Sequence, residues 1–188
     1  LMAKDYAALI RDSLVSADPL HSDIYESNYQ ALAIKIDALD QAIITATATI
    51  ESSQRLLLTY HDAYAYFART YGWTVIGAIQ LSSFEEPTPR EVADLIDQVK
   101  DAGVPAIFGS EVFPSSVLEQ IGNEAGVRYV DVLRDDDLIG APGDPEHSWL
   151  ALMRFDYLTM VESLGGDASA LKALDVTDVG LDTADYSQ

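Results

Sequence analysis

The pattern of apolar residues changes from strand-like to helix-like within residues 56–72, and this change constrains the fold more than any other feature of the sequence. Residues 56–58 are three leucines, an apolar run too short for a buried helix and typical of a buried strand in a parallel sheet. After His61, apolar residues recur at helical spacing up to Gly72, which can end a helix. His61 therefore stands where a strand ends and a helix begins. In open α/β sheets ligands bind at that edge, so the imidazole is either a site residue or a packed connector.

Strand and helix patterns alternate from residue 56 to residue 174. Further strands are predicted at residues 73–79, 105–108 and 126–133, and helices at residues 88–103, around 117–121, at 148–164 and at 168–174. This order predicts an α/β fold with a four-stranded parallel sheet flanked by helices on both faces. The strand ends at Tyr60-His61, at Ser110-Glu111 and after Leu133 should then open onto one edge of the sheet.

Two helices are predicted ahead of the first strand. Residues 2–17 carry apolar side chains on one helical face, and Asp18-Pro19 ends that helix. Residues 22–52 carry an apolar seam whose members alternate four and three apart, namely Leu32, Ile36, Leu39, Ile43, Ala46 and Ile50. A coiled coil is one alternative. The seam is short and no charge ladder flanks it, so a helix laid against a domain, or spanning two, fits better.

Composition excludes several classes of function. The chain has 31 acidic and 11 basic residues and a formal net charge of −20, which repels nucleic acid and anionic membrane surfaces and favours cations. The absence of cysteine excludes disulfides, thiolate metal sites and cysteine nucleophiles. No apolar run reaches the ~20 residues that a membrane span needs. The sequence also lacks glycine-rich phosphate loops and a nucleophile elbow.

The residues around His61 resemble a known family. The segment Tyr60-His61-Asp62-Ala63-Tyr64-Ala65-Tyr66-Phe67-Ala68, followed by Tyr71-Gly72, resembles the C-terminal lobe of the metal-binding solute-binding proteins of ABC importers. A second segment, His147-Ser148-Trp149-Leu150-Ala151-Leu152-Met153-Arg154, is similar to the start of the last long helix of that family. These proteins capture zinc, manganese or iron outside the membrane.

The resemblance implies a division of the chain. Residues 1–26 would be a helical remnant of the N-terminal lobe, and residues 27–52 a long helix that links the lobes. Residues 53–175 would form the C-terminal metal-binding lobe, followed by an acidic tail at residues 176–188, which we expect to fray. The chain begins in mid-helix, so we expect a piece of a longer protein.

The resemblance also implies metal ligands. In the family the residue at the place of His61 is a ligand, and a histidine there usually accompanies zinc. The family often has an acidic residue near Glu111, which could ligate directly, orient His61 as an outer-shell partner or face solvent; we favour the outer-shell role. The family's final ligand is usually a carboxylate at the place of His147. Either His147 replaces it or Asp144 reaches in from the loop, and position favours His147.

The function implied is capture of a divalent transition metal without turnover, with Zn²⁺ favoured and Mn²⁺ or Fe²⁺ as alternatives. The partners implied are the membrane permease of an ABC importer and the missing N-terminal lobe, which supplies two further histidines. The location implied is extracytoplasmic, in the periplasm or at the cell surface on a lipid anchor. Without the missing lobe we expect weak metal binding. The alternatives are a metal-dependent hydrolase, in which His61, His147 and Glu111 surround an open coordination position, and an interaction module that has lost metal binding.

Overall fold

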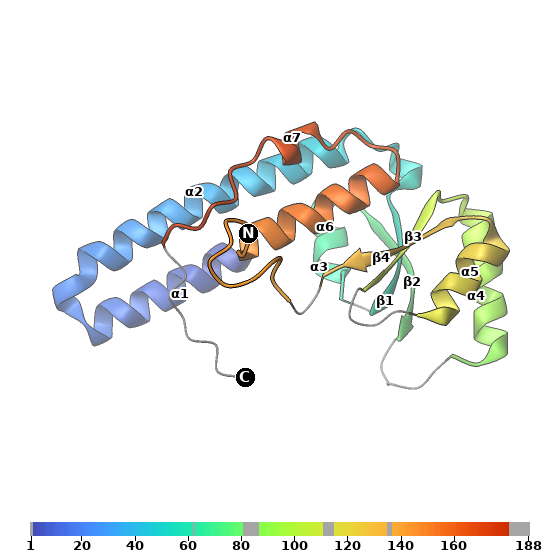
Figure 1. The fold of residues 1–188 in the computed structure, drawn as a ribbon, viewed down its shortest axis with the longest axis horizontal. Coiled ribbons are helices and arrows are strands. Elements are labelled where there is room, and N and C mark those ends of the chain that lie inside the picture. The colour runs from blue at the N-terminus through green and yellow to red at the C-terminus, as the bar shows by residue number, and fades with distance from the viewer. Residues whose placement is uncertain (1, 62, 81–86, 111–114, 135–136, 181–188) are drawn as a thin grey trace.

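The computed structural model describes residues 2–61, 63–80, 87–110, 115–134 and 137–180 (Figure 1). The helices are α1 (Met2–Ala17), α2 (Ser22–Thr47), α3 (Ala65–Tyr71), α4 (Pro89–Ala102), α5 (Ser116–Ala125), α6 (Trp149–Ser163) and α7 (Ser169–Lys172). Short 3-10 helices lie at Pro19–His21 and Ser52–Gln54. The strands are β1 (Leu56–His61), β2 (Thr74–Gln80), β3 (Ala106–Ser110) and β4 (Arg128–Leu133). The predicted alternation of strand and helix is confirmed.

The four strands form two parallel pairs. Backbone hydrogen bonds join β1 to β2 and β3 to β4, and β1 lies beside β3. The predicted α/β class, parallel strands and flanking helices are confirmed, but within the described residues the layer is hydrogen-bonded as two pairs instead of one continuous sheet. The register shifts between Leu57 and Leu58 in one pair and between Phe108 and Ser110 in the other. In each pair the extra residue lies on the outer strand, at Ile76 in β2 and between Val130 and Leu133 in β4, and such a bulge bends the strand that carries it.

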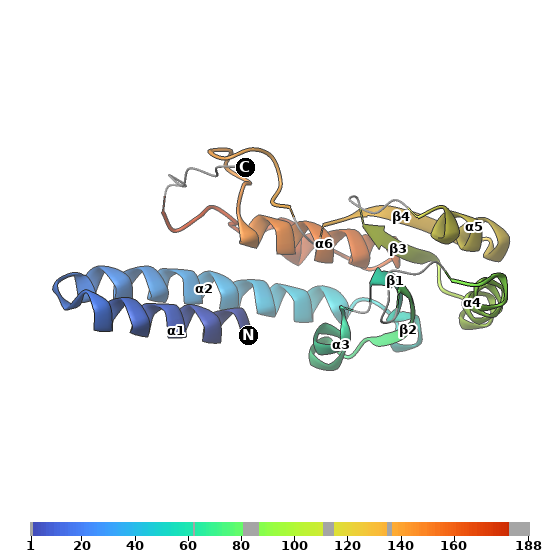
Figure 2. The ribbon, with the colours of Figure 1, turned by 90° about the horizontal axis from the view of Figure 1, so that it is seen from below.

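The strands bury side chains on both faces, and each face has its own core. Leu57 and Phe108 pack with α2 and α6 in one cluster, whereas their neighbours Leu58 and Ile107 pack with α4 and α5 in the other. All four side chains are almost completely buried. Consecutive strand residues point to opposite faces, so a strand covered on both sides is apolar in a continuous run and not at alternate positions. Figure 2 shows α4 and α5 at one end of the molecule and α2 and α6 extending from the strands toward the other.

Helix α2 forms an antiparallel hairpin with α1, and the hairpin extends away from the strands (Figure 2). The predicted helix over residues 22–52 ends earlier, at Thr47. The Thr49 hydroxyl donates to the carbonyl of Ala46 (2.6 Å) and accepts a hydrogen bond from the amide of Asp167 (2.7 Å). Ile50 then enters the core, where it is 3% exposed. The chain therefore leaves the helical path because Thr49 and Ile50 have tertiary partners.

Side chains cap the starts of two helices, α4 and α6. Thr88 caps α4 by accepting from the amide of Glu91 (3.3 Å), while the Glu91 carboxylate accepts from the amide of Thr88 (2.7 Å). This capping box lowers the pKa of Glu91, because its carboxylate accepts hydrogen bonds from the Thr88 backbone and side chain. Ser148 caps α6 by accepting from the amide of Ala151 (3.0 Å).

The segment after α7 differs from expectation. We expected the chain to fray beyond Asp175, but Val176 is buried in the same core as α2 and α6. Charge and weak periodicity suggested a loose tail, whereas one apolar side chain and several hydrogen bonds fasten residues 174–177. Among the described residues, no helix combines the length and the apolarity that crossing a bilayer would demand.

Candidate functional site

The carboxyl ends of three strands meet at one small pocket. His61 ends β1, Ser110 ends β3 and Leu133 ends β4, and all three residues line a cavity of about 40 Å³. The predicted convergence of these strand ends is confirmed for the residues that the structure describes. A cavity of this size holds roughly one to three water molecules or one dehydrated ion.

His61 is held at this edge by its own strand. The buried Thr59 donates its hydroxyl hydrogen to the carbonyl of His61 (2.8 Å), and Gln80 of β2 is the backbone partner of His61 in the parallel pair. The Tyr60 ring meets the imidazole edge-on, with ring centroids 4.7 Å apart. These contacts fix the backbone of His61 and leave its ring partly exposed at the mouth of the cavity.

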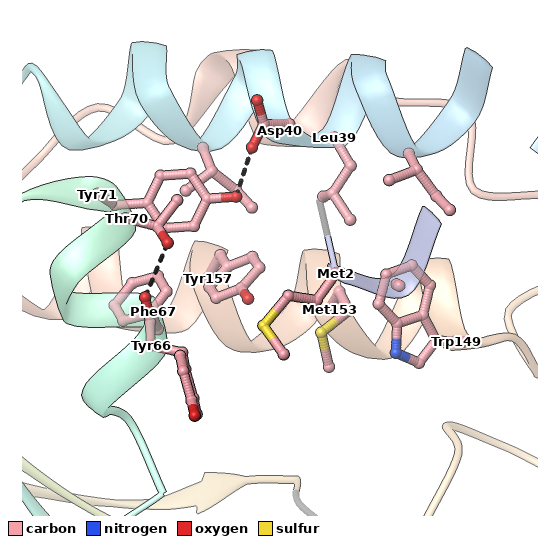
Figure 3. A pocket seen from close by; sticks show the side chains of 13 residues that line it. Met2, Leu39, Asp40, Tyr66, Phe67, Thr70, Tyr71, Trp149, Met153 and Tyr157 are labelled. Carbon is pink, nitrogen blue, oxygen red and sulfur yellow. Dashed lines mark hydrogen bonds between the residues drawn. The ribbon is translucent and has the colours of Figure 1, made fainter. Parts of the chain in front are cut away.

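The aromatic residues that follow His61 anchor α3 to α2 and α6 (Figure 3). Phe67 stacks on Tyr157 of α6, with ring centroids 5.2 Å apart and an angle of 11° between the rings. The Tyr71 hydroxyl donates to the Asp40 carboxylate of α2 (2.7 Å). Burial and this hydrogen bond raise the pKa of Tyr71 well above its usual range. The aromatic pattern after His61 thus fixes where the chain leaves the strand end.

His147 lies in a second pocket, at the start of α6. Its Nδ1 donates to the carbonyl of Ile139 (3.0 Å), because a carbonyl oxygen can only accept. In a neutral ring this bond places the proton on Nδ1 and the lone pair on Nε2, the form in which histidine binds a metal while a carbonyl orients it. The pocket has a volume of about 220 Å³ and is also lined by Asp144, Thr177 and Asp178.

Asp144 shapes the loop that carries His147. Its Oδ2 accepts from the amide of Ala141 (2.9 Å), and its own amide donates to the carbonyl of Ala141 (2.9 Å). Gly140 has φ +70°, and a β-carbon there would lie 2.7 Å from Oδ2 of Asp144. The carboxylate therefore closes a tight turn that needs glycine at this position.

The predicted ligands do not all meet within the described part of the chain. His61 lines the strand-end cavity, and His147 and Asp144 line the pocket at α6. Glu111 lies outside the described residues. Among those that are described, no group of three or more histidine, aspartate or glutamate side chains is placed to hold a metal ion.

Comparison with known proteins gives the chain a family. The family described as zinc-uptake complex component A, periplasmic (ZnuA) matches residues 1–163. The chain belongs to the ZnuA family. This family consists of metal-binding solute-binding proteins of ABC importers, so the expected resemblance is confirmed, and so is the expectation that the chain is not an enzyme.

Individual members of the ZnuA family are similar over most of this chain. The manganese-binding lipoprotein MntA of Halalkalibacterium halodurans is 30% identical over 159 residues, which cover 85% of this chain and 53% of MntA. The iron-binding protein YfeA of Yersinia pestis is 30% identical over 160 residues, which cover 85% of this chain and 51% of YfeA. The chain thus spans about half the length of the curated relatives it matches.

A solved structure in the ZnuA family has the same fold. The S38A mutant of a manganese-bound periplasmic metal-binding protein from Candidatus Liberibacter asiaticus superposes with a TM-score of 0.75 and 25% identity. The superposition covers 86% of this chain and 60% of the other chain.

The sequence did not indicate the contacts that support these pockets. The buried carboxylate of Asp156, on α6, accepts from the amide of Arg134 just after β4 (2.9 Å). It thereby ties the end of β4 to the helix that follows His147. An aspartate inside a largely apolar helix was the available signal, because such a side chain needs a partner when it is buried.

Proposed function

We propose that this chain is the C-terminal part of an extracytoplasmic protein that captures a divalent transition metal and delivers it to the permease of an ABC importer. The observation that carries the proposal is His61, which ends β1 at a cavity formed by three strand ends in a chain of the ZnuA family. A partly exposed imidazole on a rigid strand end can bind a metal ion and release it again. Capture without turnover needs no catalytic group beside it.

We assign His61 and His147 as the ligands that this chain contributes. The Nδ1–H bond of His147 to Ile139 supports the assignment, because in a neutral ring it places the lone pair on Nε2, the nitrogen that would bind a metal. Asp144 is the weaker candidate, since one of its carboxylate oxygens already closes the turn at Ala141. We assign Glu111 as an outer-shell partner that orients His61.

The cargo that we favour is Zn²⁺, with Mn²⁺ and Fe²⁺ as alternatives. Two imidazoles form a ligand set that suits zinc, whereas carboxylates and water suit manganese better. The relatives MntA and YfeA are named for binding manganese and iron, respectively, and these metals are therefore part of the test. The net charge of −20 attracts any of these cations.

We further propose that residues 1–26 belong to an N-terminal lobe and that residues 27–52 link it to the metal-binding lobe at residues 53–175. The acidic segment at residues 176–188 follows, and its first residue, Val176, packs into the core of that lobe. Helix α1 has no buried residue among those described, and four of its large apolar side chains are 41–64% exposed, namely Tyr6, Leu9, Ile10 and Leu14. The matched relatives are about twice as long as the aligned part. The rest of the N-terminal lobe would cover this exposed face and supply the remaining ligands.

The proposal predicts the effect of one substitution. In the full-length protein, His61→Ala should lower the affinity for Zn²⁺ by at least about 100-fold, since even outer-shell partners of a metal are worth 10–100-fold. Isothermal titration calorimetry with Zn²⁺, Mn²⁺ and Fe²⁺ measures the effect and ranks the metals.

His21→Ala is the matched control. His21 lies between α1 and α2, where its Nδ1 pairs with Asp18 (2.6 Å), and its replacement should leave the metal affinity unchanged. Equal affinities of the His61→Ala variant and the wild type would refute the assignment. Tight Zn²⁺ binding by these 188 residues alone would refute the need for a second lobe.

A further inference from the structure

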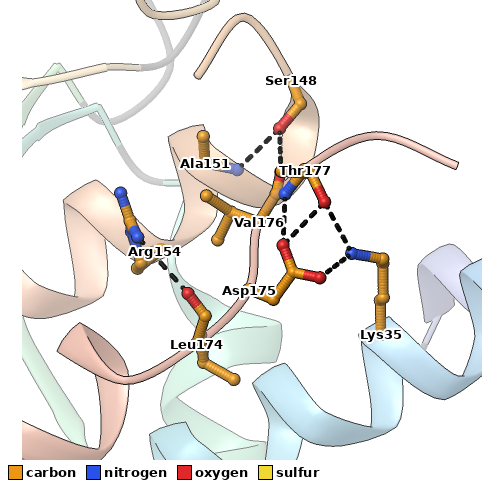
Figure 4. Close-up of polar contacts among 8 residues, drawn as sticks. All are labelled: Lys35, Ser148, Ala151, Arg154, Leu174, Asp175, Val176 and Thr177. Atoms are coloured by element: carbon orange, nitrogen blue, oxygen red, sulfur yellow. Dashed lines mark hydrogen bonds and ion pairs between the residues drawn. The ribbon is translucent and has the colours of Figure 1, made fainter. Parts of the chain in front are cut away.

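Residues 174–177, here called the clasp, run from α7 along α2 and α6 and contact both helices (Figures 1 and 4). Val176 anchors the clasp, because its side chain is 7% exposed in the core shared with these helices. Two sets of hydrogen bonds hold the clasp. One set joins the side chains of Asp175 and Thr177 to Lys35 of α2, and the other joins the backbone carbonyls of residues 174 and 176 to α6 and its cap.

The clasp is joined to α2 through Lys35. The ammonium of Lys35 donates to Oδ2 of Asp175 (2.7 Å) and to the hydroxyl of Thr177 (3.2 Å). Oδ1 of Asp175 accepts from the amide and the hydroxyl of Thr177 (3.0 and 2.6 Å). Lys35 and Thr177 together hold the pKa of Asp175 well below its usual range. The carboxylate therefore stays charged at every pH at which the protein would bind a metal.

The clasp is joined to α6 through the residue after His147. The hydroxyl of Ser148 donates to the carbonyl of Val176 (2.9 Å) and accepts from the amide of Ala151 (3.0 Å). Ser148 is 2% exposed, so water does not compete for these bonds. The only hydrogen that this hydroxyl can donate is thus given to the clasp, and the same oxygen caps the helix.

Glu146, the residue before His147, is also connected to the clasp, through Arg154. Arg154, one turn into α6, pairs with the Glu146 carboxylate (2.5 Å) and makes a longer contact of 3.4 Å to the carbonyl of Leu174. His147 thus lies between two residues, Glu146 and Ser148, that are both connected to residues 174–177. Thr177 also lines the pocket that His147 lines.

We propose that the clasp holds His147 in the position from which it binds the metal, and that Lys35 and Asp175 are positioning residues for His147. The inference rests on the proposed function, because it treats His147 as a ligand. Productive metal geometry tolerates displacements of only about 0.5 Å, so a ligand at the start of a helix needs that start to be fixed. The clasp connects His147 to Lys35 of α2, which lies 112 residues earlier in the chain.

Two variants separate positioning from simple charge effects. Lys35→Met removes a positive charge and Asp175→Asn removes a negative charge, and both release the clasp from α2. A long-range charge effect would move the Zn²⁺ affinity in opposite directions in the two variants. Loss of positioning lowers the affinity in both, by about 10-fold, the lower end of the effect of an outer-shell partner.

The controls are Lys35→Arg, which keeps the ion pair, and Lys172→Met, which removes an ion pair of similar length between Lys172 and Glu162 (2.5 Å). Both should bind Zn²⁺ like the wild type. The ¹⁵N chemical shifts of the His147 ring, recorded in the full-length protein without metal at about pH 8.5, where imidazoles are neutral, report its tautomer independently of metal binding. In Lys35→Met and Asp175→Asn we expect these chemical shifts to move from the values of the Nδ1–H tautomer toward those of a mixture of the two tautomers.

The outcomes distinguish this inference from the proposed function. A lower affinity in both variants with shifted His147 signals supports the clasp. Wild-type Zn²⁺ binding with unchanged ring signals overturns it, and so do affinities that change in opposite directions. If the wild type binds none of the three metals but the ring signals still shift, the metal function fails and the clasp stands as a structural device.

Discussion

At the scale of single residues, the burial of Tyr157 makes the stability of the fold depend on pH. Burial, with a smaller contribution from the carboxylates of Asp156 and Asp40, raises the pKa of Tyr157 to about 12, against about 10 in an unfolded chain. The neutral phenol is therefore favoured in the fold. This stabilisation is fully present below pH 10 and is lost as the pH rises to about 12.

Tyr157→Phe should thus make the free energy of unfolding less sensitive to pH. Between pH 10 and 12 the free energy of unfolding of the wild type should fall by up to about 2–3 kcal/mol more than that of the variant, since one pKa unit corresponds to about 1.4 kcal/mol. Urea denaturation at several pH values measures the difference. Tyr6→Phe, at a tyrosine that is 59% exposed, should follow the wild type. Identical slopes for Tyr157→Phe and the wild type would contradict the argument from burial.

The position of a residue along a strand was easier to predict than its contacts. The place of His61 at a strand end followed from the local change of periodicity between residues 56–58 and Gly72. The hydrogen bond from His147 to Ile139 did not follow, because it depends on how the loop between them closes. Local patterns determine the direction of the chain, whereas a contact across eight residues of loop depends on turns that tertiary packing selects.

At the scale of elements, the inner face of α3 was predictable and its partners were not. The spacing of Phe67, Ala68 and Tyr71 indicated which side of the helix is buried, and the structure confirms it. The sequence did not indicate that Phe67 would stack on Tyr157 or that Tyr71 would bind Asp40. Periodicity identifies a buried face, but the element that covers it comes from the topology.

The division of the strands into two pairs was missed for a related reason. The strand patterns predicted four parallel strands, and all four are present. Register irregularities at Leu58 and Phe108 depend on side-chain packing between layers, which single-strand patterns do not contain.

Gly109 of β3 leaves room for the side chain of Tyr129 from β4. A β-carbon on Gly109 would lie 2.5 Å from the hydroxyl oxygen of Tyr129, which accepts from the amide of Ser115 (3.2 Å). Gly109→Ala should therefore displace the Tyr129 ring and lower the free energy of unfolding by about 1–3 kcal/mol. Gly180→Ala, where a β-carbon meets no atom within 4 Å, is the control and should change stability by less than about 0.5 kcal/mol. Chemical denaturation of both variants checks this, and equal stabilities would show that the Tyr129 ring moves aside without a cost in stability.

At the scale of the whole molecule, the structure presents two kinds of surface. The cavity around His61 and the pocket around His147 carry the imidazoles, and the exposed face of α1 carries apolar side chains. The sequence predicted both the imidazoles and the apolar face. It could not predict how far apart the two pockets lie in the isolated chain, because that distance depends on how the loops between strands and helices settle.

In the proposed function, His61 and His147 bind one metal ion together. Anomalous diffraction at the zinc absorption edge, from crystals of the full-length protein grown with Zn²⁺, would locate that ion. We expect one strong peak about 2.0–2.1 Å from a ring nitrogen of His61 and from Nε2 of His147. A peak coordinated by other residues, with the His61 ring outside the coordination sphere, would contradict it.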